Sequence, residues 1–209
     1  MQQLCIQCIH CFMLEEIAKI PDGAERTAAL VRFVQRLFDP PGAVPVLVGG
    51  AAVELYTGGA YTTSDLDFVG HVSAEAADRL KTEGFERRGR HWIHERAQVF
   101  LEFPSLDLEP GEVPVWTRVR KQRVRVLSVE DLIVDRLAAW RHWRSPIDGV
   151  NAWLLWRSKR SRLDRRRLSR RADSAGVADA YRRLLRFDRK WPTRRPTDQE
   201  VREWATDGP

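Results

Sequence analysis

Two aspartates separated by one residue, Asp65 and Asp67, lie in a short apolar segment. In a β-strand, residues i and i+2 point to the same side, so the two carboxylates are predicted to share one face while Leu66 and Phe68 pack on the other. Two carboxylates this close repel each other unless a cation lies between them. Hard oxygen donors suit Mg²⁺ or Mn²⁺, and proteins commonly hold Mg²⁺ with one or two carboxylates plus substrate phosphates. The pair therefore predicts a metal site with a phosphorylated ligand.

A double glycine, Gly49-Gly50, ends the apolar segment Val46–Val48, and fourteen residues separate Gly50 from Asp65. A glycine turn from a strand into a helix lets phosphates approach backbone N–H groups at the helix N-terminus, where the helix dipole also favours anions. We therefore expect Gly49 and Gly50 to bind a triphosphate, with Ser64 nearby.

A third carboxylate, Glu102, interrupts the apolar segment Val99–Phe103. A charge in so apolar a strand is costly unless its face opens into a cleft or toward a metal ion. Glu102 is thus the candidate third acid of a two-metal site. The alternative is an edge strand with a protruding glutamate.

The hydrophobic pattern predicts an α+β protein, in which a small mixed β-sheet with flanking helices precedes a helical C-terminal region. Residues 104–114 are acidic and are expected to form a loop. Strands are expected near 44–48, 65–69, 91–95, 98–103 and 119–126. Helices are expected within 14–38 on either side of a break at 21–23, from about 50, and over 73–81, 129–143, 146–157, 161–171 and 177–187. Predicted helix N-caps are Ser73, Ser128 and Thr197, the last forming a capping box with Glu200.

The class change near residue 128 divides the chain into an expected catalytic core over 13–127 and a helical region over 128–209. Residues 1–12 are expected to form a disordered leader. They hold all three cysteines (Cys5, Cys8 and Cys11) and His10. Structural zinc sites usually take ligand pairs from separate parts of a chain, so a metal site in this leader is the less favoured alternative.

The charge is unevenly distributed. Residues 157–195 hold sixteen Lys or Arg and four Asp, a balance of +12, whereas the whole chain carries +6, so the remainder carries −6. A basic segment of this kind favours a polyanion such as RNA, because each neutralised phosphate releases counterions. Arginines on solvated helix faces are the equally weighted alternative. If the segment binds RNA, charge reversal at Arg165, Arg166 and Arg167 is expected to weaken that binding.

No apolar stretch approaches the roughly 18 residues of a membrane helix, and no secretory signal is recognisable. These features predict a cytoplasmic protein without a membrane partner.

The order Gly49-Gly50, then Asp65-x-Asp67, then Glu102 resembles the motif of the nucleotidyltransferase superfamily, which has a polymerase-beta-like fold. Residues 49–67 and 127–140 are also similar to abortive-infection-type nucleotidyltransferase toxins and their uncharacterised relatives. The resemblance extends over about 44–155 and leaves the basic tail outside. It implies a magnesium-dependent enzyme that transfers a nucleoside monophosphate from a nucleoside triphosphate to an acceptor hydroxyl. Asp65, Asp67 and Glu102 would be its catalytic, metal-binding residues.

The same resemblance implies that Arg136, Arg141 and Arg144 bind the nucleotide by neutralising the pyrophosphate, and makes Asp148 a further candidate. The chain departs from the family pattern at two positions. Ala60 stands where many relatives have a basic residue, and Arg136 stands where the toxins typically have lysine. Arginine can bind a phosphate through two hydrogen bonds, but it cannot donate a proton near neutral pH.

Three functions remain open at the level of sequence. The first is transfer to an RNA end, in particular tRNA, by the toxin of a toxin–antitoxin pair with a small antitoxin protein as partner. The second is a drug-hydroxyl adenylyltransferase acting on a small molecule. The third is a non-catalytic RNA-binding protein on the same fold. Tryptophans of the helical half are either base-stacking groups or, as we favour from their helical spacing, core residues: Trp140, Trp143, Trp153 and Trp156.

Overall fold

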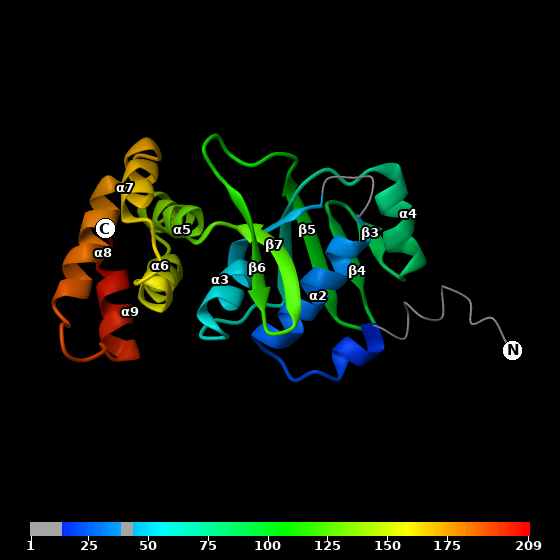
Figure 1. The fold of residues 1–209 in the computed structure, drawn as a ribbon, viewed down its shortest axis with the longest axis horizontal. Helices are drawn as coiled ribbons and strands as arrows, with labels where there is room; N and C mark the ends of the chain where they lie inside the picture. The colour runs from blue at the N-terminus through cyan, green and yellow to red at the C-terminus, as the bar shows by residue number, and fades with distance from the viewer. Residues whose placement is uncertain (1–13, 39–43) are drawn as a thin grey trace, which may run out of the picture. The chain divides into compact units, whose positions relative to one another are not determined.

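The structure, a computed structural model, describes residues 14–38 and 44–209. The expected leader, with its cysteines and His10, lies outside the described residues. The chain divides into two compact units, one ending at Leu127 and the other running from Ser128 to Pro209, which we call unit 1 and unit 2. Unit 1 combines a sheet with helices, and unit 2 is helical (Figure 1). The fold class is α+β, as predicted.

Within the described part of unit 1, seven strands form one mixed sheet in the order β3-β4-β5-β2-β1-β7-β6. Strand β2 runs antiparallel to β1 and parallel to β5, and β1 runs parallel to β7. The strands are β1 (Val46–Val48), β2 (Asp65–Val69), β3 (Glu86–Arg88), β4 (His91–His94), β5 (Val99–Ser105), β6 (Pro114–Val119) and β7 (Gln122–Leu127).

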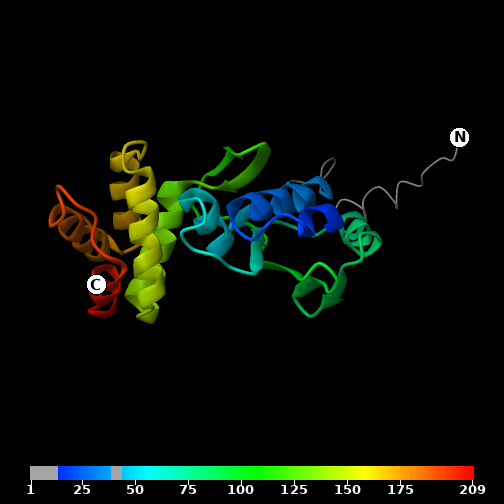
Figure 2. The ribbon, with the colours of Figure 1, turned by 90° about the horizontal axis from the view of Figure 1, so that it is seen from below.

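Unit 1 also contains helices. Besides a helical segment over 14–18, they are α2 (Ala24–Arg36), α3 (Gly49–Thr57) and α4 (Ala74–Thr82). Helices α2 and α3 lie side by side, as Figure 2 shows. The fully buried Gln35 joins α2 to the sheet, because its Nε2 donates to the carbonyl of Pro45 at 2.9 Å and its Oε1 accepts from the Arg125 N–H at 3.0 Å.

The alternation in β2 fixes which side chains enter the core. Leu66 and Phe68 are buried, and Phe68 lies opposite Leu47 of β1 while Leu66 lies opposite the fully buried Leu101 of β5. The intervening aspartates must then point to the other face of the sheet. Hydrophobic burial thereby orients the polar residues of this strand.

Two strands were missed by the sequence analysis, and both are edges of the sheet. All three residues of β3 are exposed, so it has no buried alternating face. Strand β6 begins at Pro114, within a segment expected to be a loop, and pairs only with β7. Proline lacks a backbone N–H and is tolerated in edge strands, so β6 can begin there, while residues 106–113 form the expected loop.

Unit 2 consists of α5 (Val129–Trp143), α6 (Pro146–Lys159), α7 (Arg165–Ser174), α8 (Ala178–Arg189) and α9 (Asp198–Thr206). The predicted N-caps are confirmed. The Asp131 N–H donates to Ser128 Oγ at 3.2 Å, and Thr197 forms the full capping box with Glu200; in unit 1, Ser73 caps α4. Among the described residues, no helix is both long enough and apolar enough to cross a membrane.

Tryptophans form much of the core of unit 2, as predicted for Trp140, Trp153 and Trp156, which are buried. The Trp140 indole N–H donates to the carbonyl of Ala205 at 2.7 Å, which joins α5 to α9. The prediction is wrong for Trp143, which is 80% exposed at the last position of α5.

Candidate functional site

The predicted aspartate pair lies on one face of β2. Asp65 is exposed and Asp67 is half-buried, while Leu66 and Phe68, which alternate with them, are buried. The two carboxylates therefore share the face opposite the core, as the sequence predicted.

Glu102 lies beside this pair on the neighbouring strand. In the parallel pairing of β2 with β5, Glu102 is the direct partner of Asp67, and Asp65 is the partner of Phe100. Paired strands are about 4.8 Å apart, so Glu102 and Asp67 extend from adjacent positions on the same face. Strand β5 lies between β4 and β2, which makes the edge-strand alternative for Glu102 wrong.

Gly49 makes room for the Asp67 carboxylate. A Cβ at Gly49 would lie 2.2 Å from Asp67 Oδ2, and the backbone there has φ +66, which favours glycine. Gly49 is also the first residue of α3, whose N-cap residue, Val48, provides no side-chain cap. The Asp67 carboxylate is thus held against the turn at a helix N-terminus, where the helix dipole stabilises negative charge. This contact gives the glycine a role within the protein, beside the phosphate binding expected from sequence.

Gly50 allows a second close approach. A Cβ here would lie 3.1 Å from Tyr61 Cε1 and 3.3 Å from Thr63 Cγ2, so the segment leading into β2 packs tightly on α3. Thr63 Oγ1 accepts from the Asp65 N–H at 3.4 Å, and Ser64 Oγ donates to Asp65 Oδ1 at 3.3 Å. Gly50 and Ser64 therefore both help to position Asp65, Gly50 by leaving room for Thr63 and Ser64 by its hydrogen bond.

Two basic residues that were not predicted from the sequence lie against Glu102. Arg90 Nε lies 2.9 Å from Glu102 Oε1, and His91 Nδ1 lies 3.7 Å from Oε2. His91 is the antiparallel partner of Glu102. Strands β4 and β5 were both expected, so a prediction of how they pair would have placed His91 opposite Glu102. Arg90 lies in the turn between β3 and β4, and no sequence pattern predicted this turn.

The carboxylates provide hard oxygen donors for a divalent ion. Among the described residues, no three His, Cys, Asp or Glu side chains converge closely enough to hold a metal ion. Mg²⁺ needs only one or two carboxylates when waters and phosphates complete its octahedron, so Asp65 and Asp67 fit such a site. Glu102 could join it only after leaving Arg90.

The three arginines expected to bind nucleotide belong to unit 2. Arg136 is held within that unit by Asp135 at 2.5 Å and by the buried Asp148 at 2.7 Å. Arg141 Nε lies 2.7 Å from Asp179 Oδ2. Arg144 is exposed, with φ 51, at the C-cap of α5. Arg136 and Asp148 thus join α5 to α6, which gives both a structural role.

The basic segment of unit 2 contains two kinds of arginine. One kind binds buried aspartates: Arg167 and Arg171 lie 2.5 and 2.9 Å from Asp131, whose side chain is 0% exposed. The other kind is exposed: on helix surfaces Arg166, Arg170, Arg182, Arg186 and Arg189, and in the turn between α6 and α7 Arg162. Arg167 is therefore bound to a buried aspartate of unit 2, and it is not part of a free basic surface, contrary to the prediction from sequence.

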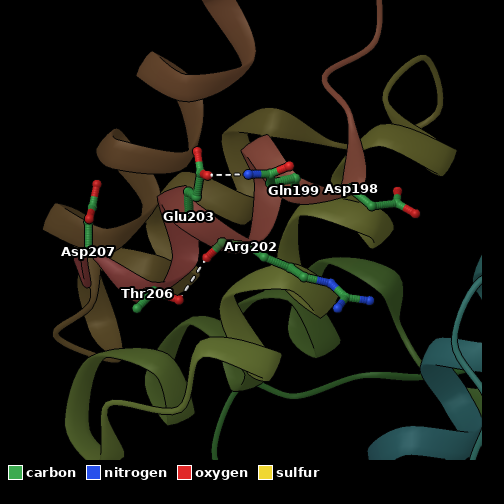
Figure 3. Close-up of a pocket in the computed structure, with 6 residues that line it drawn as sticks. All are labelled: Asp198, Gln199, Arg202, Glu203, Thr206 and Asp207. Carbon is green, nitrogen blue, oxygen red and sulfur yellow. Dashed lines mark hydrogen bonds between the residues drawn. The ribbon is translucent and has the colours of Figure 1, made fainter.

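Unit 2 also has a surface hollow, which Figure 3 shows. All of its lining residues come from α9 and the residue after it. Gln199 Nε2 donates to Glu203 Oε1 at 2.8 Å, and Thr206 Oγ1 donates to the carbonyl of Arg202 at 2.8 Å. These bonds satisfy neighbouring groups of one helix, so the hollow presents no group that requires a ligand.

Comparisons with protein-family models, with curated proteins and with solved structures find no match for this chain.

Proposed function

We propose that the chain is a magnesium-dependent nucleotidyltransferase, which transfers a nucleoside monophosphate from a nucleoside triphosphate to an acceptor hydroxyl. One observation carries the proposal. Asp67 lies against Gly49 on one side and beside Glu102 on the other, and Asp65 shares its face. This arrangement supports a site for a metal ion and a triphosphate at the N-terminus of a helix.

Each residue has a distinct role in the proposed site. Asp65 and Asp67 hold the ion, Mg²⁺ or alternatively Mn²⁺. The bound ion supplies charge neutralisation at the phosphates and lowers the pKa of the acceptor hydroxyl. The N–H groups at Gly49 and Gly50 bind phosphate oxygens, with Ser64 beside them. Glu102 accepts the proton of the acceptor hydroxyl after it separates from Arg90.

The proposed acceptor is the end of an RNA, in particular a tRNA. The exposed arginines of α7 and α8 support this choice, because they present positive charge that no buried aspartate neutralises. In the proposal, Arg136, Arg141 and Arg144 neutralise the leaving pyrophosphate, which requires Arg136 to exchange its carboxylate partners for phosphate. The protein would act in the cytoplasm as a toxin, and a small antitoxin protein would be its inhibitor.

The experiment is incubation of the purified full chain with Mg²⁺, each of the four labelled nucleoside triphosphates, and total RNA. Labelled RNA that is absent with the Asp65→Asn, Asp67→Asn double variant supports the proposal and identifies the donor. Label in a small-molecule fraction would move the acceptor to the drug-hydroxyl class. RNA binding without any label would favour the non-catalytic alternative.

A further inference from the structure

A cavity of about 370 Å³ lies in unit 1, and Ser64, whose hydroxyl donates to Asp65 Oδ1, is one of its lining residues. Its walls come from the start of α2, from α3, from the segment that leads into β2 and from the turn before β5. Apart from Gly23 and Leu30, every lining residue has a charged or hydrogen-bonding side chain. A volume in this range suits a small molecule, and the lining favours a polar one.

Glu54 of α3 is the unusual member of this lining. It is only 1% exposed, and its carboxyl accepts hydrogen bonds from the Thr27 hydroxyl and the Thr63 N–H. Its second oxygen, Oε2, is buried and has no hydrogen-bond partner among the described residues. Buried acceptors are nearly always bonded, and leaving one unsatisfied costs about 1–3 kcal/mol. A ligand with a donor group would supply the missing bond.

The other two charged residues of the cavity, Asp22 and Arg26, form an ion pair, while the buried Nε of Arg26 has no hydrogen-bond partner among the described residues. Arg26 Nη1 donates to Asp22 Oδ1 at the rim, and the Asp22 side chain is 86% exposed. No ion pair to Glu54 exists among the described residues. With Arg26 committed to Asp22, the ionised cavity carries one net negative charge, and it lies at Glu54.

We propose that this cavity binds a small hydroxylated molecule with a protonated amine, which donates to the Glu54 carboxylate. A cationic donor is favoured over a neutral one because hydrogen bonds between charged groups are roughly twice as strong. The hydroxyl groups of the ligand would meet Thr62, Ser64 and Gln98.

A ligand bound in the cavity would also affect the hydrogen bonds at the start of β2. Thr63 donates to Glu54 through its N–H and accepts from the Asp65 N–H through its hydroxyl. A ligand that draws the Glu54 carboxyl toward its amine would change this connection. The binding itself does not depend on nucleotide transfer, because it is measured without nucleotide or divalent ion.

The test uses D-glucosamine and D-glucose, which differ in whether position 2 carries an ammonium or a hydroxyl group. Both are titrated into the full chain, without nucleotide or divalent ion, by calorimetry and by ¹H–¹⁵N NMR. We expect glucosamine to bind at least about tenfold more tightly than glucose, the value of one charge-assisted hydrogen bond. We also expect glucosamine alone to shift the amide resonances of Thr63 and Gly50.

Glu54→Gln keeps the shape of the side chain and removes its charge, so it should abolish the preference for glucosamine. Glu86→Gln, at an exposed position of β3, is the matched control and should preserve it. Equal binding of the two sugars, no binding of either, or a preference that survives Glu54→Gln would each overturn the proposal. If Glu54→Gln fails to fold, the amide shifts of the unmodified chain decide: shifts confined to residues outside the cavity would also overturn it.

Discussion

The two units use carboxylates in opposite ways. In unit 2, buried aspartates are enclosed by arginines: Asp131 by Arg167 and Arg171, and Asp188 by Arg157 and Arg160. In unit 1, by contrast, Asp65 and Glu54 have no ion pair among the described residues. The difference distinguishes carboxylates whose ion pairs hold helices together from carboxylates that could bind a metal ion or a ligand.

Asp131 illustrates the structural use of charge. Its side chain is 0% exposed, and it accepts hydrogen bonds from two arginines of α7 and from Ser128 Oγ at 2.6 Å. The desolvation cost of a buried charge is offset only when well-placed ion pairs and hydrogen bonds surround it. The arginine-rich composition of α7 is therefore partly a requirement of the unit 2 core.

Glu54 and the aspartate pair illustrate the other use. Neighbouring carboxylates on one strand face, and a buried carboxyl with an oxygen unpartnered among the described residues, both oppose stability. Arrangements that cost stability are found mostly at functional sites, where the rest of the fold compensates for them. The comparison thus directs functional tests to unit 1 and stability tests to unit 2.

Asp131→Asn should produce the largest loss of stability. Removing the charge leaves Arg167 and Arg171 without their buried partner, and such losses cost about 3–5 kcal/mol. Chemical denaturation of the full chain, followed by tryptophan fluorescence, measures it, because the buried tryptophans of unit 2 report on that core. Asp173→Asn, at an exposed position of α7, is the control and should change the free energy of unfolding by less than about 0.5 kcal/mol. A loss no larger than the control would contradict the structural role.

The Asp65→Asn, Asp67→Asn double variant should show the reverse pattern. Its unfolding free energy should stay within about 0.5 kcal/mol of the parent or rise, because the substitution keeps the side-chain shape and relieves repulsion. If the proposed function holds, nucleotide transfer should fall by at least about 10²-fold, the effect of losing one preorganised electrostatic group. Denaturation and the labelled-nucleotide assay provide the two measurements. A variant that loses several kcal/mol of stability would instead make the pair structural.

Charge reversal on the surface of α7 should have a smaller effect. Arg166→Glu with Arg170→Glu changes two exposed arginines and leaves Arg167 and Arg171 on Asp131. If RNA binds this surface, the slope of log affinity against log salt should become less negative by about 1.4, since each single-strand phosphate contact contributes about 0.7. Fluorescence anisotropy with a labelled single-stranded RNA measures the slope. Arg202→Glu, exposed on α9 outside the basic segment, is the control, and an equal change there would indicate a general charge effect.

The elements that position the site were largely predictable from sequence. The alternation of Leu66 and Phe68 with the aspartates oriented β2, and the side-chain caps at Ser73 and Ser128 marked helix starts. These signals are local, since they depend on residues within one or two turns. For the same reason, the two edge strands were missed, because an exposed edge has no buried face to impose a pattern.

Features that depend on tertiary contacts were not predictable. The pairing of Arg90 and His91 with Glu102 depends on strand register, and the isolation of Glu54 depends on how α2 packs on α3. Likewise, the series of arginines in α7 gave no indication that Arg167 pairs with a buried aspartate. Sequence identified which residues could do chemistry, whereas the structure determined which of their charges are already occupied.

The smallest expected effect is a difference in the pH dependence of the two units. Burial raises the pKa of Glu54 above its usual value of 4.5, while hydrogen bonds from Thr27 and Thr63 offset part of the shift and the nearby charge of Asp22 adds to it. In unit 2, the Arg194 side chain and the Thr197 N–H lower the pKa of Glu200 to about 2.

These shifts have opposite signs in stability. An acid with a raised pKa binds its proton more tightly in the folded state, so its contribution is fully present below pH 4.5 and is lost as pH rises through the folded pKa of Glu54. An acid with a lowered pKa contributes above pH 4.5, and the contribution of Glu200 is lost as pH falls toward about 2. Acidification from neutral pH toward 4.5 should therefore protect unit 1 through Glu54, whereas acidification below pH 4.5 should weaken unit 2 through Glu200.

Hydrogen exchange of α3 and α9 amides, measured by mass spectrometry and corrected for the intrinsic pH dependence, reports each unit separately. Glu54→Gln should remove the gain in α3 protection, and Glu200→Gln should remove the loss in α9 protection. If α3 protection in the Glu54→Gln variant still rises on acidification, Glu54 is not the source, and the contrast between the two units would then rest on their ion pairs alone.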